Sequence, residues 1–400
     1  MYGACVGSGS LALTTNRMKL TNIQILRALA AAFVVYVHSL SIYKAKVGIT
    51  GDNLIPNLDD LGDLGVKLFF CISGFIIFNC ASRLPGGVQS SLDFFVKRCI
   101  RILPLYYAAT SIYALKLAFQ GNTPSIRHYL SSIFFIPYAD QSGLMRPVLG
   151  QGWTLNFEML FYLLMTLLLL ASRSRLRYHA LVAVLVLLVV LNHTWLATSN
   201  VAVFASLGLI TNELLLFFAG GIIVGMSGAK VKLLALRCFG RLAPLVGALV
   251  ALGVAVFARA TLHGQAFEGL LFGVEWACCI FAVFAASLPN EVTHGFKSAL
   301  LQPVIKAGDG SYSTYLLHGF FAGPAAWLVS FLHINVSMQW FAIAMVIVCS
   351  AVGIYCYKYF ELPVQHALSD FWNAKKARVW RVFDVARRQR RRRDTGAASK

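Results

Sequence analysis

Residues 153–172 have the sequence WTLNFEMLFYLLMTLLLLAS, twenty positions that contain one charged side chain, that of Glu158. The hydrocarbon core of a bilayer is about 30 Å thick, and a helix needs roughly 20 apolar residues to cross it. A surface helix of a soluble protein would instead carry a polar face along its whole length. The stretch therefore predicts a transmembrane helix.

Similar apolar runs recur along the whole chain of 400 residues, which is 58% hydrophobic and only 13% charged. Soluble domains carry about 25% charged residues, and the mean hydropathy here is +0.69. The apolar runs cover residues 22–43, 62–81, 103–119, 153–172, 179–196, 203–226, 242–259, 268–288, 311–331 and 338–360. Strands of a membrane barrel are shorter and alternate in polarity. The sequence thus predicts an all-α fold, a polytopic integral membrane helix bundle of about ten transmembrane helices.

The positive charges are divided unequally between the two sides of this predicted bundle. Of the 35 Lys and Arg residues, 27 fall on one side, five fall on the other, and three lie within the apolar runs. Short cytoplasmic loops are the ones enriched in Lys and Arg. We therefore expect a multi-pass protein of the bacterial inner membrane with both termini in the cytoplasm.

Three segments follow from these patterns. Residues 1–21 are expected to form a disordered cytoplasmic N-terminus, in which Met18 is a possible true start and a cleaved signal peptide is the alternative. Residues 22–362 form the predicted membrane domain, because Glu361-Leu362-Pro363 is typical of a helix end. Residues 363–400 are predicted to be a basic cytoplasmic tail.

The tail contains a dense arginine run between residues 387 and 393. Its expected partners are anionic membrane lipids, and nucleic-acid binding is the less favoured alternative. The nine cysteines show no metal-ligand spacing, so neither a metal site nor a disulfide framework is expected.

Arg27 and His38 share one face of the first predicted helix. The eleven steps between them come to about three full turns and a rise of about 16 Å. Ionisable residues at membrane depth are costly and point to function, whereas helix packing is the simpler alternative for each one taken alone.

Glu158 lies about 8 Å inside its helix, a depth that matches His38 on the outer side. We expect this carboxylate to meet and orient the imidazole of His38, with Asn156 and Tyr162 as polar neighbours. The alternative is that Glu158 only ties two helices together.

Arg98 and Arg101 lie three residues apart on one helix face at the inner side. Paired guanidinium groups bind phosphates through bidentate hydrogen bonds, although positive-inside anchoring explains either residue alone. Asp63 and Lys67 are expected to form an ion pair within one helix. Glu213 and Glu275 are buried acids without evident partners, and His318 is placed for packing or for donor binding.

Several motifs occur in a characteristic order. They are Ile25–Ala28 followed by His38, Gly65–Phe75, Arg98–Tyr106, Gly152–Tyr162 and Ser311–His318. In this order they resemble the bacterial acyltransferase-3 membrane family, and most closely its exopolysaccharide acetyltransferases of the succinoglycan type.

The resemblance implies a bundle of ten helices with acyl-CoA, such as acetyl-CoA, as a cytoplasmic co-substrate and no tightly bound cofactor. It implies His38 and Glu158 as catalytic residues and Arg27, Arg98, Arg101 and His318 as acyl-CoA-binding residues. The same motifs supply Ser73, Trp153, Asn156, Tyr162 and Tyr312 as supporting residues. Lys67 departs from the pattern, because relatives usually have an aspartate before the two phenylalanines.

These observations predict an O-acyltransferase in which His38 acts as general base on a hydroxyl of a cell-surface or exopolysaccharide sugar. An acyl-His38 intermediate is the mechanistic alternative. The expected acceptor is a saccharide, either lipid-linked or free of lipid. The alternatives for the assembly are a polysaccharide-synthesis complex and a homodimer. The functional alternatives are a transporter of polysaccharide or lipid-linked sugar and a scaffold within such a complex.

Overall fold

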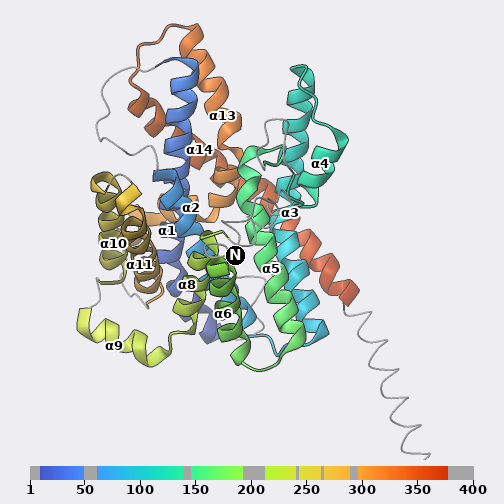
Figure 1. Ribbon diagram of the computed structural model, residues 1–400, viewed down its shortest axis with the longest axis vertical. Coiled ribbons are helices and arrows are strands. Elements are labelled where there is room, and N and C mark those ends of the chain that lie inside the picture. The colour runs from blue at the N-terminus through green and yellow to red at the C-terminus, as the bar shows by residue number, and fades with distance from the viewer. Residues whose placement is uncertain are drawn as a thin grey trace, which may run out of the picture.

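The computed structural model describes residues 10–48, 61–138, 146–191, 212–239, 243–262, 265–288 and 296–376. Within these ranges the chain contains helices and no strand (Figure 1), which confirms the all-α prediction. The α-helices are α1 (Ser10–Lys46), α2 (Leu61–Ala81), α3 (Val88–Phe119), α4 (Ile126–Ile133), α5 (Trp153–Ala171), α6 (Leu176–Leu191), α8 (Leu214–Met226), α9 (Ala229–Phe239), α10 (Ala243–Thr261), α11 (Glu268–Ala286), α12 (Phe296–Asp309), α13 (Ser311–Phe331) and α14 (Met338–Cys356). Short 3-10 turns η2 (Gly150–Gly152) and η5 (Gln265–Phe267) precede α5 and α11, and the π-helix η6 (Tyr357–Glu361) continues α14.

Seven helices in the described ranges are long and apolar enough to cross a membrane, and the count becomes eight if α8 and α9, bent by 83°, form one span. The count of about ten is therefore not confirmed. Of the predicted runs, 179–196 corresponds to α6, which has 16 residues, and 203–226 ends in α8, which has 13. The run 311–331 forms α13, which contains His318, Pro324 and several Ser and Gly residues, and α13 is not among the seven. Apolar composition alone does not show whether a run is one full-length helix.

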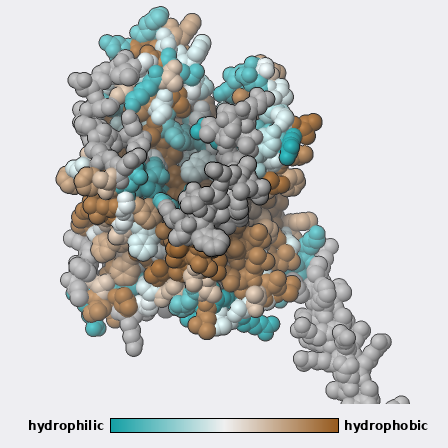
Figure 2. Space-filling model, in the orientation of Figure 1, coloured by the Kyte–Doolittle hydropathy of each residue, from teal (hydrophilic) through white to brown (hydrophobic). Residues whose placement is uncertain are grey.

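Helix α1 is central to the bundle and packs against α2, α12, α13 and α14. Helix α2 packs most extensively against α8, while α3 packs against α5 and α10 against α11. The contact between α2 and α8 brings two backbones together, because a Cβ atom on Gly221 would lie only 2.0 Å from the carbonyl oxygen of Cys71. Small residues at helix contacts are the usual means of close packing in a membrane. On the face drawn in Figure 2, apolar residues form a broad band with polar residues above and below it.

Both ends of the predicted membrane domain differ from expectation. Helix α1 begins at Ser10, within the segment expected to be disordered, whose residues 10–20 contain neither Gly nor Pro to interrupt a helix. At the other end the helix continues past Pro363 to residue 376 instead of ending there. The reason is the π-turn of η6, in which the Leu362 N–H donates to the Tyr357 carbonyl and the widened turn accommodates the proline ring. The predicted tail thus starts as helix, and its arginine run lies outside the described residues.

The helix over residues 362–376 is fastened to the start of α3. Asp93 accepts a hydrogen bond from the Trp372 indole N–H at 3.0 Å and forms ion pairs with Lys376 at 3.0 Å and Lys97 at 2.9 Å. This contact holds the C-terminal helix beside the part of α3 that carries Arg98 and Arg101.

Candidate active site

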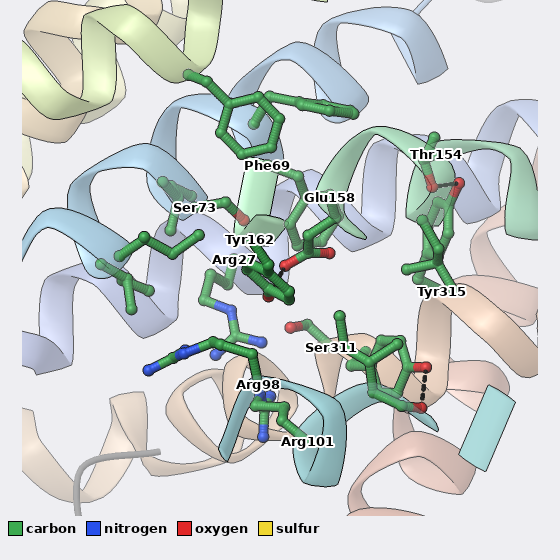
Figure 3. Close-up of a pocket in the computed structure, with 18 of the residues that line it drawn as sticks. Arg27, Phe69, Ser73, Arg98, Arg101, Thr154, Glu158, Tyr162, Ser311 and Tyr315 are labelled. Carbon is green, nitrogen blue, oxygen red and sulfur yellow. Dashed lines mark hydrogen bonds between the residues drawn. The ribbon is translucent and has the colours of Figure 1, made fainter. Parts of the chain in front are cut away.

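The centre of the bundle contains an open cavity, whose space, open solvent included, is about 800 Å³. Six helices, α1, α2, α3, α5, α8 and α13, contribute residues to its lining (Figure 3). The polar lining residues are Arg27, Ser73, Arg98, Arg101, Thr154, Glu158, Tyr162, Ser311, Tyr312 and Tyr315. We refer to this space as the arginine cavity, since its lining has three guanidinium groups and one carboxylate.

The three arginines are largely buried. Arg27 is 5% exposed and donates to the Gln24 side chain at 3.1 Å, and Arg98 is 7% exposed and lies over the Phe94 ring. Arg98 and Arg101 lie one helical turn apart on α3, as their spacing predicted, and both reach the same cavity as Arg27. The structure therefore brings together all three arginines that the sequence singled out.

Arg101 has partners that the sequence analysis missed. Its guanidinium lies 4.0 Å from the carboxylate of Glu361 and donates to the Gln365 side chain at 3.5 Å. Glu361 is 2% exposed and also accepts hydrogen bonds from Ser313 and Gln365. Because the motif around Glu361 was interpreted as a helix end, nothing in the sequence placed this acid inside the bundle.

Glu158 is the carboxylate that lines the arginine cavity. It accepts a hydrogen bond from the Tyr162 hydroxyl, one helical turn away on α5. A second acid, Asp309, stands at the end of α12, outside the membrane spans, and interacts electrostatically with Arg27 and Arg101. Burial raises the pKa of Asp309 above its ordinary value, while the two arginines act in the opposite direction.

Beyond the arginine cavity, His38 of α1 and His318 of α13 form a direct pair. Nδ1 of His38 lies 2.7 Å from Nε2 of His318, and Nδ1 of His318 lies 2.7 Å from the carbonyl oxygen of Tyr315. A carbonyl oxygen only accepts, so Nδ1 of His318 carries a hydrogen. In a neutral His318, Nε2 is then an acceptor, and Nδ1 of His38 must be the donor.

The histidine pair therefore has a defined tautomer. His318 is 1% exposed, and burial without a counter-charge disfavours its cationic form. The chain of hydrogen bonds leaves Nε2 of the partly buried His38 with a free lone pair, which is the form required of a base. Tyr315 connects the pair to the arginine cavity, because its side chain lines that cavity and its carbonyl holds His318.

Comparison with known proteins places this arrangement in a family. The family model described as an acyltransferase domain, acyltransferase-3, matches residues 20–358. The chain belongs to the acyltransferase-3 family. It is 32% identical over 311 residues to the exopolysaccharide production protein ExoZ of Rhizobium meliloti, covering 76% of this chain and 90% of that protein. It is 29% identical over 186 residues to nodulation protein 10 of Rhizobium leguminosarum bv. viciae, covering 40% of this chain and 47% of that protein. No solved structure matches the chain.

The match agrees with the resemblance found in the motifs, and with the apolar helices it identifies a membrane acyltransferase. The arginine cavity and the histidine pair both lie within the matched residues. Glu361 and Gln365, the partners of Arg101, lie beyond residue 358.

One expected contact of this acyltransferase does not form. Among the described residues, the hydrogen-bond partner of Glu158 is Tyr162, and that of the His38 ring is His318. Helix α13 packs against α1, while α5 packs mainly against α3. Equal depth in the membrane therefore did not make Glu158 a neighbour of His38, because depth does not determine which helices are adjacent. His318, expected among the acyl-CoA-binding residues, is absent from the lining of the arginine cavity and contacts His38 instead.

The supporting residues are divided between two places. Ser73, Tyr162 and Tyr312 line the arginine cavity, and the Tyr312 hydroxyl donates to the Ile102 carbonyl at 2.9 Å. Trp153 and Asn156 are absent from its lining. Trp153 packs edge-on against Phe157 with ring centroids 5.9 Å apart, and the side-chain oxygen of Asn156 is buried without a partner among the described residues.

Lys67, the residue that departs from the family pattern, has two acidic partners in the structure. Lys67 pairs with Asp63 at 2.7 Å, as predicted, and with Glu275 at 2.8 Å. Arg259 contacts the same two acids, at 2.8 Å and 2.5 Å respectively. Glu275 is thus not a lone acid but one member of an ion cluster formed by Asp63, Lys67, Arg259 and Glu275. Spacing along the chain could not predict this cluster, because its four residues come from three separate helices.

Proposed function

We propose that this acyltransferase moves an acetyl or similar short acyl group from cytoplasmic acyl-CoA to a hydroxyl of a cell-surface or exopolysaccharide sugar. The observation that carries the proposal is the arrangement of the arginine cavity, which Tyr315 joins to a histidine pair with one free basic nitrogen. Family membership supports acyl transfer. The printed name of the relative ExoZ, an exopolysaccharide production protein, supports the class of acceptor.

The arginine cavity suits the phosphates of the donor. Guanidinium groups bind phosphate oxygens through paired hydrogen bonds, and three of them line one space here. On α1, the distance from Arg27 to His38 is about 16 Å along the helix axis. The pantetheine arm would extend in this direction, past Tyr315, and bring the thioester to the histidine pair.

In the reaction, Nε2 of His38 takes the proton from the acceptor hydroxyl as its oxygen attacks the thioester carbonyl. The ester C–O bond forms, the C–S bond breaks, and the proton held by His38 passes to the departing thiolate. Nε2 of His318 accepts a hydrogen bond from the Nδ1–H group of His38. This bond keeps Nε2 of His38, the basic nitrogen, directed away from His318. His318 is therefore a positioning residue in this mechanism.

Glu158 takes a different role from the one expected. Its contact with Tyr162 and its place among the arginines support a role in offsetting the repulsion between the guanidinium groups and in orienting them. We propose that it shapes the donor site and does not assist His38.

The test is a His38→Ala variant expressed in cells that lack the native gene. We expect acylation of the polysaccharide, followed by NMR, to fall by about 10²–10⁴-fold, the range typical of a general base. The purified variant should still bind CoA, because His38 is absent from the lining of the arginine cavity. Normal acylation by a correctly inserted His38→Ala protein would exclude this mechanism. Lost export with normal acylation of the polymer that remains would favour the transporter.

A further inference from the structure

We infer that the first turn of α13, centred on the Ser311 hydroxyl, is a phosphate-binding subsite of the arginine cavity. The inference rests on the proposed function, since it assigns the phosphate to the acyl-CoA donor. It adds a hydroxyl donor and a helix N-terminus to the arginines already described.

The main observation is the burial of the Ser311 hydroxyl without a hydrogen-bond partner among the described residues. Ser311 is fully buried, lines the arginine cavity, and its hydroxyl has no hydrogen-bond partner among the described residues. Figure 3 shows this side chain directed into the space between the arginines and Tyr162. A buried hydroxyl without a partner is costly, and a phosphate oxygen in the cavity would supply the missing acceptor.

The neighbouring hydroxyl groups show that this state is specific to Ser311. Ser and Thr in helices often donate to a carbonyl one turn earlier, and Thr314 does so to Gly310 at 3.2 Å. The Ser313 hydroxyl donates to Glu361. Of the three hydroxyl-bearing residues Ser311, Ser313 and Thr314, the one that faces the arginine cavity is the one without a partner.

The first turn of α13 places the positive end of a helix dipole at the arginine cavity. Helix α13 has 21 residues, and its N-cap is Gly310, which offers no side chain to cap the helix. The positive end of a helix dipole favours an anion. The positive potential of this helix end adds to that of Arg27, Arg98 and Arg101, while Glu158 is the carboxylate in the lining. Outside the lining, Glu361 pairs with Arg101, and Asp309 interacts with Arg27 and Arg101.

The turn is also held rigidly in place. A Cβ atom on Gly310 would lie 2.6 Å from the Gly353 carbonyl oxygen, so the backbones of α13 and α14 touch at this point. On the other side, the Tyr312 hydroxyl donates to the Ile102 carbonyl of α3, the helix that carries Arg98 and Arg101. The backbone at Ser311 is therefore held in place relative to α3 and its arginines.

The test compares CoA affinity in the purified full-length protein by titration calorimetry. We expect Ser311→Ala to weaken CoA binding by roughly ten- to one-hundred-fold, the loss typical of a hydrogen bond to a charged group. Pantetheine, which has no phosphate, should bind the variant and the wild type alike. Ser39→Ala is the matched control, because Ser39 is also fully buried without a partner but does not line the arginine cavity. If Ser311→Ala fails to fold, Ser311→Cys preserves the volume and provides only a weak donor.

Each outcome separates this inference from the proposed function. Unchanged CoA affinity in Ser311→Ala, together with a loss in the Arg98→Ala Arg101→Ala double variant, would overturn the subsite and leave the proposed function standing. An equal loss of affinity for pantetheine would also overturn it, since Ser311 would then contact the arm. Failure of CoA to bind the wild-type protein would overturn both proposals. A loss for CoA but not for dephospho-CoA would support contact with the ribose phosphate, and an equal loss for both would support contact with the diphosphate.

Discussion

The ion cluster and the arginine cavity are two groups of buried charges with opposite organisation. In the ion cluster, two cations and two carboxylates face one another at 2.5–2.8 Å and link α2, α10 and α11. In the arginine cavity, three guanidinium groups and one carboxylate line an open space of about 800 Å³, open solvent included. A buried charge needs a partner, and the ion cluster supplies its own. The lining of the arginine cavity has three cations and one carboxylate, with Glu361 beside Arg101 outside the lining, and this lining suits an anionic ligand.

The largest effect should come from breaking the balance of the ion cluster. Glu275→Gln leaves Lys67 and Arg259 with Asp63 as the remaining carboxylate of the cluster, and we expect it to lower the free energy of unfolding by about 3–5 kcal/mol. Unfolding in mixed detergent micelles would measure this, and CoA affinity of the folded fraction should not change. The double variant Lys67→Met Glu275→Gln should recover part of the loss. Wild-type stability of Glu275→Gln would show that the cluster does not hold the helices together.

Substitutions of the cavity arginines should change CoA affinity, which substitutions in the ion cluster should leave unchanged. Replacing Arg98 by Ala should weaken CoA binding by roughly ten- to one-hundred-fold while stability changes little, because the substitution removes one of several like charges. Arg101→Ala should weaken CoA binding by a similar factor, but it should also lower stability, because it removes the cation beside the buried Glu361 carboxylate. The Lys variants should also bind more weakly, since an ammonium group cannot form the bidentate contact. Titration calorimetry measures the affinity. A variant that loses stability but keeps CoA affinity would show that these arginines, like the ion cluster, hold helices together and do not bind the donor.

The histidine pair extends the comparison to buried polar groups without charge. His318→Leu leaves the Nδ1 hydrogen of His38 without an acceptor, and we expect the turnover rate to fall by about five- to one-hundred-fold with the KM for acyl-CoA unchanged. His318→Gln, which has an acceptor near the position of Nε2, should restore part of the rate. Equal rates for the Leu and Gln variants would mean that His318 only fills space.

The smallest effect is expected at the contact between Asp93 and the C-terminal helix. Asp93→Asn weakens the ion pairs with Lys97 and Lys376, which are partly exposed, and should cost about 0–1 kcal/mol. CoA affinity should fall slightly, because the same helix carries Gln365 beside Arg101. Thermal unfolding and calorimetry would detect both changes, with Lys375→Ala as a control on the same helix. A large loss of affinity would show that this contact controls the arginine cavity.

The sequence predicted those parts of the site that depend on one segment at a time. The spacing of Arg98 and Arg101 placed them on one face of α3, and both line the same cavity. The ion pair of Asp63 and Lys67, one turn apart, also formed as expected. The sequence could not show that Glu361 lies inside the bundle, because the π-turn that carries the helix past Pro363 breaks the rule on which the prediction depended.

The sequence by itself determined that this is an all-helical membrane protein of the acyltransferase-3 family. Both conclusions depend on local properties, namely the transfer free energy of apolar runs and the order of short motifs. Only the tertiary structure decided which polar groups are partners. His38 meets His318 and not Glu158, and Glu275 meets Lys67 and Arg259. The physical reason is that a residue's depth and helix face are properties of its own helix, whereas its partner depends on which helices are adjacent and how each is rotated.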